Sequence, residues 1–249
     1  MAQNSVAILG GNRMADDWFR LAREGGLTVH RYGRAAEVDP ATAVVVDTLP
    51  HGLEAKRQLL EELDGTVPGA SVVLSSCLRW SATTIACWSR RPERVVGFAT
   101  FHPLAQRDVI ELARGLDTAE EAVRAAESLV RGMGKESALV KDAPGLVFPR
   151  ILSLIINEAA RSLDEGIATA EEIDIALRLG TNYPQGPLRW ADEIGLDEVL
   201  AVIEGLQEET GDDRYRPAPL LKKLVASGRL GEAVGRGFHE HGEPGDDAA

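Results

Sequence analysis

The sequence has few cysteines, no long apolar segment and a deficit of positive charge. Of its 249 residues only Cys77 and Cys87 are cysteines, which provide neither a metal-binding spacing nor a disulfide framework, so we expect a reducing compartment. No apolar run approaches the ~20 residues that cross a bilayer. The run from Val6 to Leu9 is too short for a signal peptide. These absences predict a cytoplasmic protein with no membrane partner.

The charge is strongly acidic, with 27 Lys and Arg against 39 Asp and Glu, a formal net charge of −12. Such a surface repels the phosphates of nucleic acids and anionic lipids, so we expect no nucleic-acid partner. A local basic pocket for a phosphate group stays compatible with this balance. The content of 44% hydrophobic and 27% charged residues is ordinary for a globular protein.

The first 142 residues alternate short apolar runs with helical patterns. Alternation of this kind is typical of βαβ units and a parallel sheet. The sequence therefore predicts an α/β fold, a Rossmann-like doubly wound domain over residues 1–142, with a capping box at Thr118 and Glu121. Strands are expected at 5–9, 27–32, 43–47, 70–75, 94–99 and 137–140, and helices after Gly11 and at 53–63, 81–90 and 118–131.

After Pro144 only helical patterns follow, which predicts an all-helical C-terminal domain over residues 143–241. Helices are expected at 151–163, after a capping box at Thr169 and Glu172, after Asp197 as a cap, and at 219–226. Between two of them, residues 179–187 are rich in Gly and Pro and predict a rigid turn with Pro187 opening the next helix. Residues 242–249 contain mainly Gly, Pro and Asp and predict a disordered acidic tail.

The turn after the first strand is a degenerate dinucleotide-binding motif. Gly10, Asn12 and Ala15 occupy the three positions of G-x-G-x-x-G/A. Asn tolerates positive φ better than most residues. We therefore expect Gly10, Gly11, Asn12, Arg13, Met14 and Ala15 to bind the cofactor, with Arg13 offsetting Asp16 and Asp17 in the same turn. The alternative is a Rossmann-like fold that has lost its nucleotide.

The choice between NAD and NADP depends on the end of the second strand. NAD-binding domains usually place a carboxylate there for the ribose. This chain has His30 to Arg34 without an acid, and Arg31 suits the 2′-phosphate of NADP. A solvated basic turn is the alternative, so the cofactor is expected to be NAD or NADP.

His102 and Glu111 are the candidate catalytic pair. His102 follows the fifth expected strand, where sites form in open α/β sheets. A His beside a carboxylate is the usual general acid/base unit. The spacing does not show that the two touch, and a His before a Pro is also common as a structural turn residue.

Several segments together resemble the 3-hydroxyacyl-CoA dehydrogenase family over nearly the whole chain. The most specific are Asn182-Tyr183-Pro184-Gln185-Gly186-Pro187 and Gly195-Leu196-Asp197, similar to the family's GYPMGP…GLD. Lys141–Gly145, Gly235–Phe238, Leu53–Arg57 and Val109–Leu112 add to it. The resemblance implies a Rossmann domain, a helical domain that forms a homodimer, and hydride transfer between NAD and the 3-hydroxyl of a small-molecule acyl-CoA substrate.

The resemblance transfers the family's site residues unevenly. Its partner glutamate falls on Glu111 and its cofactor-side lysine on Lys56, while the asparagine of its HFFNP motif falls on His102. The catalytic histidine falls on Ala99, the serine on Leu78, the second asparagine on Pro149 and the glutamate before the lysine on His51. The helical hairpin that follows the second strand in the family is missing.

Two hypotheses follow from these departures. The first is a divergent NAD(P)-dependent oxidoreductase in which His102 acts as acid and base and Glu111 orients it. The second is a non-catalytic relative that keeps the scaffold and a nucleotide as a binding or regulatory protein.

Overall fold

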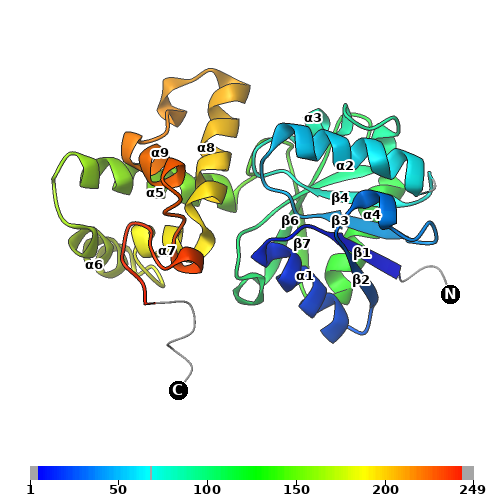
Figure 1. The fold of residues 1–249 in the computed structure, drawn as a ribbon, viewed down its shortest axis with the longest axis horizontal. Helices are drawn as coiled ribbons and strands as arrows, with labels where there is room; N and C mark the ends of the chain where they lie inside the picture. The colour runs from blue at the N-terminus through cyan, green and yellow to red at the C-terminus, as the bar shows by residue number, and fades with distance from the viewer. Residues whose placement is uncertain (1–4, 68, 243–249) are drawn as a thin grey trace. The chain divides into compact units, whose positions relative to one another are not determined.

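The computed structural model describes residues 5–67 and 69–242, and it divides into a unit ending at Val147 and a unit beginning at Phe148 (Figure 1). The boundary lies later than the one predicted after residue 142. Gly145 and Val147 still belong to the first unit, because the N–H of Gly145 donates to the carbonyl of Cys77 at 2.8 Å and that of Val147 to the carboxylate of Glu111 at 2.7 Å. Most of the predicted tail, residues 243–249, lies outside the described residues.

The first unit is built on a seven-stranded sheet in the order β2-β1-β3-β4-β5-β6-β7. Neighbouring strands are parallel except β5 and β6, which are antiparallel. The doubly wound α/β prediction is confirmed, although β6 was not expected as a strand. The strands are β1 Ser5–Leu9, β2 Thr28–Tyr32, β3 Val44–Asp47, β4 Val72–Ser76, β5 Val95–Ala99, β6 Val109–Arg114 and β7 Glu136–Val140.

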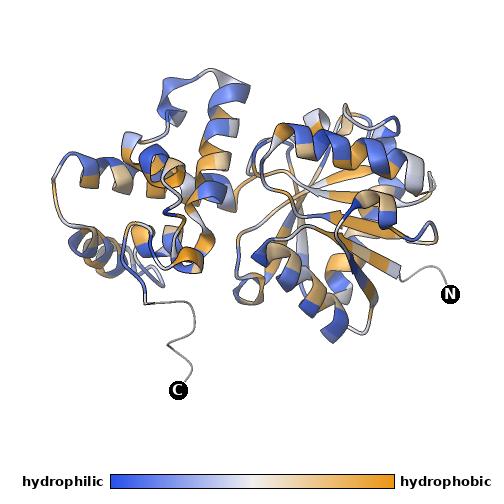
Figure 2. Cartoon of the chain, viewed as in Figure 1, coloured by the Kyte–Doolittle hydropathy of each residue, from blue (hydrophilic) through white to orange (hydrophobic). Residues whose placement is uncertain are grey.

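Helices cover both faces of this sheet. α1 (Arg13–Glu24) and α4 (Glu120–Gly132) pack on one face, in a core with Val6, Val46 and Phe98. α3 (Ala82–Ala86) packs on the other, where a Cβ on Gly97 of β5 would lie 2.8 Å from the Cβ of Ala82. α2 (Leu53–Thr66) connects β3 to β4. Figure 2 shows the strands as predominantly hydrophobic between helices with polar outer faces.

The capping box expected at Thr118 and Glu121 is wrong. α4 begins at Glu120 with Ala119 as its N-cap and no side-chain cap. The Thr118 hydroxyl instead donates to the carbonyl of Val95 at 2.7 Å and accepts the N–H of Gly115 at 2.8 Å. It therefore fastens the loop to β5 rather than capping the helix.

The second unit is helical, as predicted, with α5 Phe148–Asp164, α6 Ala170–Thr181, α7 Pro187–Ile194, α8 Leu196–Thr210 and α9 Pro219–Ala226. The capping box at Thr169 and Glu172 is confirmed. Pro187 is the first residue of α7. Asp197 does not cap α8, because the N-cap is Gly195 and Asp197 lies in the first turn.

Two buried aspartates hold the second unit's turns in place. Asp174 of α6 accepts the N–H groups of Leu188 and Arg189 at 2.8 and 3.0 Å, and lies 2.8 Å from the Nε2 of His239. Asp192 of α7 accepts the N–H groups of Phe238 and His239 at 2.8 Å. The rigid turn predicted from its Gly and Pro content is thus fixed by an acid on the preceding helix.

Candidate functional site

The glycine-rich turn between β1 and α1 combines one tightly constrained glycine with one open glycine. Gly10 has φ +136°, and a Cβ there would lie 2.1 Å from the Oγ1 of Thr48. A Cβ on Gly11 would meet no atom within 4 Å. Gly10 is therefore required by the fold, whereas Gly11 leaves space beside the helix N-terminus, where phosphates bind.

Asn12 does not serve the role of a positive-φ residue. It is extended at φ −98° and forms the N-cap of α1. Its Oδ1 accepts the N–H of Ala15 at 3.1 Å and its Nδ2 donates to the carbonyl of Thr48 at 2.9 Å. Asn12 therefore joins the turn to the end of β3. Met14 and Ala15 are buried, so only their backbone groups could meet a ligand.

A cavity of about 320 Å³ opens beside this turn. It lies at the carboxyl ends of β1, β2 and β3, the edge at which open α/β sheets bind ligands. Arg34 and Glu62 are the charged residues in its lining. Its lining includes Gly10, Gly11, Gly33, Arg34, Leu49 and Glu62.

Arg31 lies at the turn but is engaged within the protein. Its Nη2 donates to the carbonyl of Gly10 at 3.2 Å, and its Nη1 forms an ion pair with Asp16. Arg31 thus offsets the acid in the first turn of α1. Arg34, which follows β2, lines the cavity instead and lies 3.9 Å from the carboxylate of Glu62.

Lys56 does not fit the cofactor role expected for it. Its side chain is fully buried, and its Nζ lies 2.5 Å from Asp47, 2.8 Å from the carbonyl of Leu49 and 3.0 Å from that of Ser76. An ammonium has three donors, and these contacts use all three. Lys56 therefore holds the ends of β3 and β4 together from inside the unit.

His102 pairs with Asp17 of α1, which is not the partner predicted. The Nδ1 of His102 lies 2.8 Å from the Oδ2 of Asp17, and the N–H of Leu104 donates to the same oxygen at 2.7 Å. Burial by itself would raise the pKa of Asp17, but the bonds from His102 and Leu104 outweigh it and hold that pKa below its ordinary value of 3.8. Asp17 is therefore an ionised anchor for the imidazole, which keeps 20% of its side-chain surface exposed.

Glu111 lies elsewhere on the sheet edge. Its Oε2 accepts the N–H of Val147 at 2.7 Å. In the antiparallel register of β5 and β6 it is paired directly with Ala99, whose methyl group can neither donate nor accept a proton. Leu78 and Ala99 are each only 2% exposed. Burial raises the pKa of the neighbouring Cys77 thiol, which donates to the carbonyl of Phe98.

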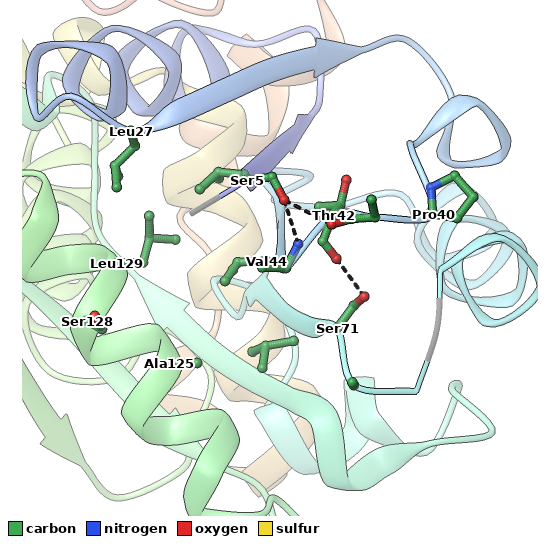
Figure 3. A pocket seen from close by; sticks show the side chains of 14 residues that line it. Ser5, Leu27, Pro40, Thr42, Val44, Ser71, Ala125, Ser128 and Leu129 are labelled. Carbon is green, nitrogen blue, oxygen red and sulfur yellow. Dashed lines mark hydrogen bonds between the residues drawn. The ribbon is translucent and has the colours of Figure 1, made fainter. Parts of the chain in front are cut away.

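A second cavity, of about 480 Å³, lies at the opposite edge of the sheet, around the amino ends of β1, β3 and β4 (Figure 3). The hydroxyl of Ser5 donates to the carbonyl of Ala41 at 3.0 Å, and that of Ser71 to the carbonyl of Thr42 at 2.7 Å. Because these hydroxyls already donate within the protein, this cavity is the weaker candidate for a polar ligand.

Neither a metal-binding group nor a membrane-spanning helix is found in the part of the chain that the structure describes. Over residues 5–67 and 69–242 no three His, Cys, Asp or Glu side chains are grouped to hold a metal ion. None of the described helices is long and apolar enough to cross a membrane.

Comparisons with known proteins cover both units. Residues 28–143 match the NAD binding domain of 3-hydroxyacyl-CoA dehydrogenase, and residues 145–241 match its C-terminal domain. The first match begins at Thr28, so the glycine-rich turn lies outside it.

Individual relatives are similar over most of their length. A probable 3-hydroxybutyryl-CoA dehydrogenase of Bacillus subtilis is 39% identical over 200 residues, 80% of this chain and 70% of that protein. A 3-hydroxybutyryl-CoA dehydrogenase of Bradyrhizobium diazoefficiens is 37% identical over 198 residues, 80% of this chain and 68% of that one. The crystal structure of (S)-3-hydroxybutyryl-CoA dehydrogenase from Ralstonia eutropha superposes with a TM-score of 0.81 at 31% identity, over 96% of this chain and 99% of that one. With both domains matched in order and a relative 39% identical over 80% of the chain, this chain belongs to the 3-hydroxyacyl-CoA dehydrogenase family.

Proposed function

We propose that this protein is an NAD-dependent oxidoreductase that transfers hydride between the cofactor and the 3-hydroxyl of a hydroxyacyl-CoA. The observation that carries the proposal is the cavity beside Gly10 and Gly11 at the carboxyl edge of the sheet. It occurs in a chain whose two units both match the family's domains. An acyl-CoA substrate is supported by the similarity to proteins named 3-hydroxybutyryl-CoA dehydrogenase.

The residues around the cavity fit a dinucleotide. Gly11 and the N-terminus of α1 would hold the pyrophosphate, since the open space at Gly11 allows close approach. Gly33 and Arg34 would lie against the ribose, and the Arg34 guanidinium extends the proposal to NADP. When bound, the nicotinamide supplies the hydride chemistry.

His102 is the proposed acid and base. Ionised Asp17 favours a proton on the Nδ1 of His102, so in the neutral imidazole Nε2 is the acceptor. A base held in this way can take the proton of a substrate hydroxyl and return it in the reverse direction. Glu111, bonded to Val147, would act as a fixed negative charge near the reacting carbon rather than as the partner of His102.

The catalytic proposal is tested by steady-state reduction of acetoacetyl-CoA with NADH and with NADPH. We expect turnover with NADH and a loss of about 10²–10⁴-fold in kcat for His102→Gln, because a general acid is removed. Asp17→Asn should lower kcat and change its pH profile, since the imidazole loses its anchor. Unchanged kcat in His102→Gln would exclude this assignment.

The cofactor site is tested by adding charge to the cavity. Gly11→Asp places a carboxylate where the pyrophosphate would lie, without a steric clash. Gly65→Asp is the matched control, because a Cβ on Gly65 of α2 also meets nothing within 4 Å. Titration with NADH should give a much weaker Kd for Gly11→Asp only. Equal Kd values in the two variants would place the cofactor elsewhere.

A second candidate function is a non-catalytic, nucleotide-binding relative. The observation that favours it is Ala99 opposite Glu111, together with the buried Leu78, since neither side chain can bond a substrate oxygen. This candidate predicts tight NADH binding without turnover of any hydroxyacyl substrate. Efficient turnover rejects it.

We also propose that the protein forms a homodimer and works in a reducing compartment such as the cytoplasm. Ile175 and Leu179, one turn apart on α6, are 50% and 71% exposed. Apolar surface of this kind on the helical unit favours a homodimer formed through it. The free thiols of Cys77 and Cys87 favour a reducing compartment such as the cytoplasm.

A further inference from the structure

Two tryptophans and two arginines form a compact cluster on the connections around β4, and we call Arg57, Arg79, Trp80 and Trp88 the arginine–tryptophan platform. The indole rings meet edge to face with centroids 5.3 Å apart. The Arg57 guanidinium lies 5.3 Å from the centre of the Trp88 ring and that of Arg79 lies 5.7 Å from the Trp80 ring. Each indole ring therefore lies close to one guanidinium cation.

The platform belongs to the ligand-binding side of the sheet. Trp80 follows the carboxyl end of β4 and directly precedes Ser81, the N-cap of α3. Arg57 follows Lys56, whose ammonium contacts the carbonyls of Leu49 and Ser76 just past β3 and at the end of β4. The loops at this edge are those that surround ligands in open α/β folds.

Exposure and charge distinguish the platform from the rest of the chain. Trp80 and Trp88 are half-buried, whereas the other two tryptophans, Trp18 and Trp190, are 0% and 8% exposed. The Arg57 side chain is 45% exposed, and its Nη1 lies 3.8 Å from the carboxylate of the exposed Glu54. Residues 79–94 contain four arginines and one glutamate in a chain of net charge −12, and of these arginines Arg94 is buried in an ion pair with Asp64.

This chemistry suits an adenine nucleotide. An indole face stacks on a base, and a guanidinium binds phosphate oxygens in pairs. A reaction between a dinucleotide and a CoA ester brings two adenine nucleotides to one chain. The cavity beside Gly11 accounts for one of them, and the α2 residues that line it, Ala55, Gln58, Leu59 and Glu62, do not include Arg57.

We infer that the arginine–tryptophan platform binds the nucleotide end of the CoA substrate, its adenosine 3′-phosphate and diphosphate. Adenine stacks on the indole pair, and Arg57 and Arg79 bind the phosphates. The inference rests on the proposed function, because it assigns the substrate's carrier group to a place on this chain.

The test compares two thioesters that differ only in this group, acetoacetyl-CoA and acetoacetyl-N-acetylcysteamine, on the full-length protein. Arg57→Gln and Trp88→Leu should raise the KM for the CoA ester about tenfold, the scale of one lost stacking or phosphate contact. Their kcat/KM for the truncated thioester should stay at the wild-type value. Arg124→Gln on α4, exposed and of equal charge change, is the matched control. An unchanged KM for the CoA ester, or equal losses on both thioesters, overturns the inference.

A binding experiment separates this inference from the proposed catalysis. Adenosine 3′,5′-bisphosphate should quench tryptophan fluorescence in the wild type and in Gly11→Asp, and the quench should weaken in Arg57→Gln. Arg57→Gln removes an exposed side chain, so it tests the site even where Trp88→Leu alters packing. A quench lost in Gly11→Asp but kept in Arg57→Gln would place the ligand in the cofactor cavity and overturn the inference. A wild type that binds the bisphosphate but turns over neither thioester would refute the proposed function and leave the platform standing.

Discussion

At the scale of single residues, the buried charges of the first unit are paired within the protein. Lys56 contacts Asp47 and two carbonyls, and Asp47 also accepts the hydroxyl of Ser75 at 2.6 Å. The carboxylate of Asp17 is hydrogen-bonded to His102, to the N–H of Leu104 and to Arg20. Charges removed from water need such partners, which explains why residues with a binding-site pattern have structural contacts.

Lys56→Met tests the structural role of this lysine. The substitution leaves Asp47 buried without its counter-charge, so we expect a loss of about 3–5 kcal/mol in the free energy of unfolding. Urea denaturation measures it, and Arg57→Met is the exposed control. A weakened Kd for NADH with unchanged stability would instead assign Lys56 to the cofactor.

Asp17→Asn tests the anchor of His102 through pH. Because the pKa of Asp17 is lowered in the folded state, its stabilisation is complete above its unfolded value and is lost as pH falls through the folded value. The difference in unfolding free energy between wild type and Asp17→Asn should therefore be greatest near neutral pH and shrink in acid, below the ordinary value of 3.8. Denaturation at a series of pH values measures it. A difference independent of pH would contradict the ionised pair.

At the scale of elements, the turn between α6 and α7 owes its shape to close approach. A Cβ on Gly186 would lie 2.2 Å from the Cβ of Asp174, and one on Gly237 would lie 2.0 Å from the Oδ1 of Asp192. Gly186 allows Asp174 to accept the N–H groups of Leu188 and Arg189 at the start of α7, and Gly237 allows Asp192 to accept those of Phe238 and His239 near the end of the chain. Pro and Gly content predicted a turn between α6 and α7, and the hydrogen bonds of Asp174 to Leu188 and Arg189 hold it against α6.

Gly186→Ala and Gly180→Ala form a matched pair for this explanation. Gly186→Ala overpacks the contact with Asp174, so we expect a loss of about 1–3 kcal/mol or more. Gly180 lies in α6 with nothing within 4 Å of its added Cβ, and alanine there should stabilise the helix by about 0.5–1 kcal/mol. Thermal unfolding measures both. A stabilised Gly186→Ala would refute the close-approach argument.

At the scale of the whole molecule, the helical unit presents the apolar surface on which the proposed dimer depends. We expect sedimentation equilibrium to give a dimer, and the double variant Ile175→Glu/Leu179→Glu to shift it toward monomer, because buried like charges oppose association. Leu116→Glu is the control, since Leu116 is 88% exposed on the first unit. A wild-type monomer, or a double variant that stays dimeric, would contradict an interface through α6.

Local pattern determined the architecture of this protein. Strand–helix alternation predicted the parallel sheet, and the helical spacing of apolar residues after Pro144 predicted the second unit. Both predictions were possible because the spacing of hydrophobic residues can be read directly from the sequence. β6 was missed because Glu111 interrupts its short apolar run and its first and last residues, Val109 and Arg114, are exposed. The prediction that Thr118 caps a helix was wrong because its hydroxyl donates a hydrogen bond to the carbonyl of Val95 on β5.

Only the tertiary structure decided which polar residues belong together. His102 lies 85 positions from Asp17 in sequence. The prediction that it would pair with Glu111 rested on the usual histidine–carboxylate unit and on the family's partner glutamate, and neither of these shows which side chains meet in the fold. Lys56 and Arg31 have the charge expected for a cofactor site, yet Lys56 is paired with the buried Asp47 and Arg31 with Asp16 at the surface. The sequence by itself determined the fold class, because periodicity is local, whereas the pairing of charges was decided by the fold, because burial is a property of the assembled chain.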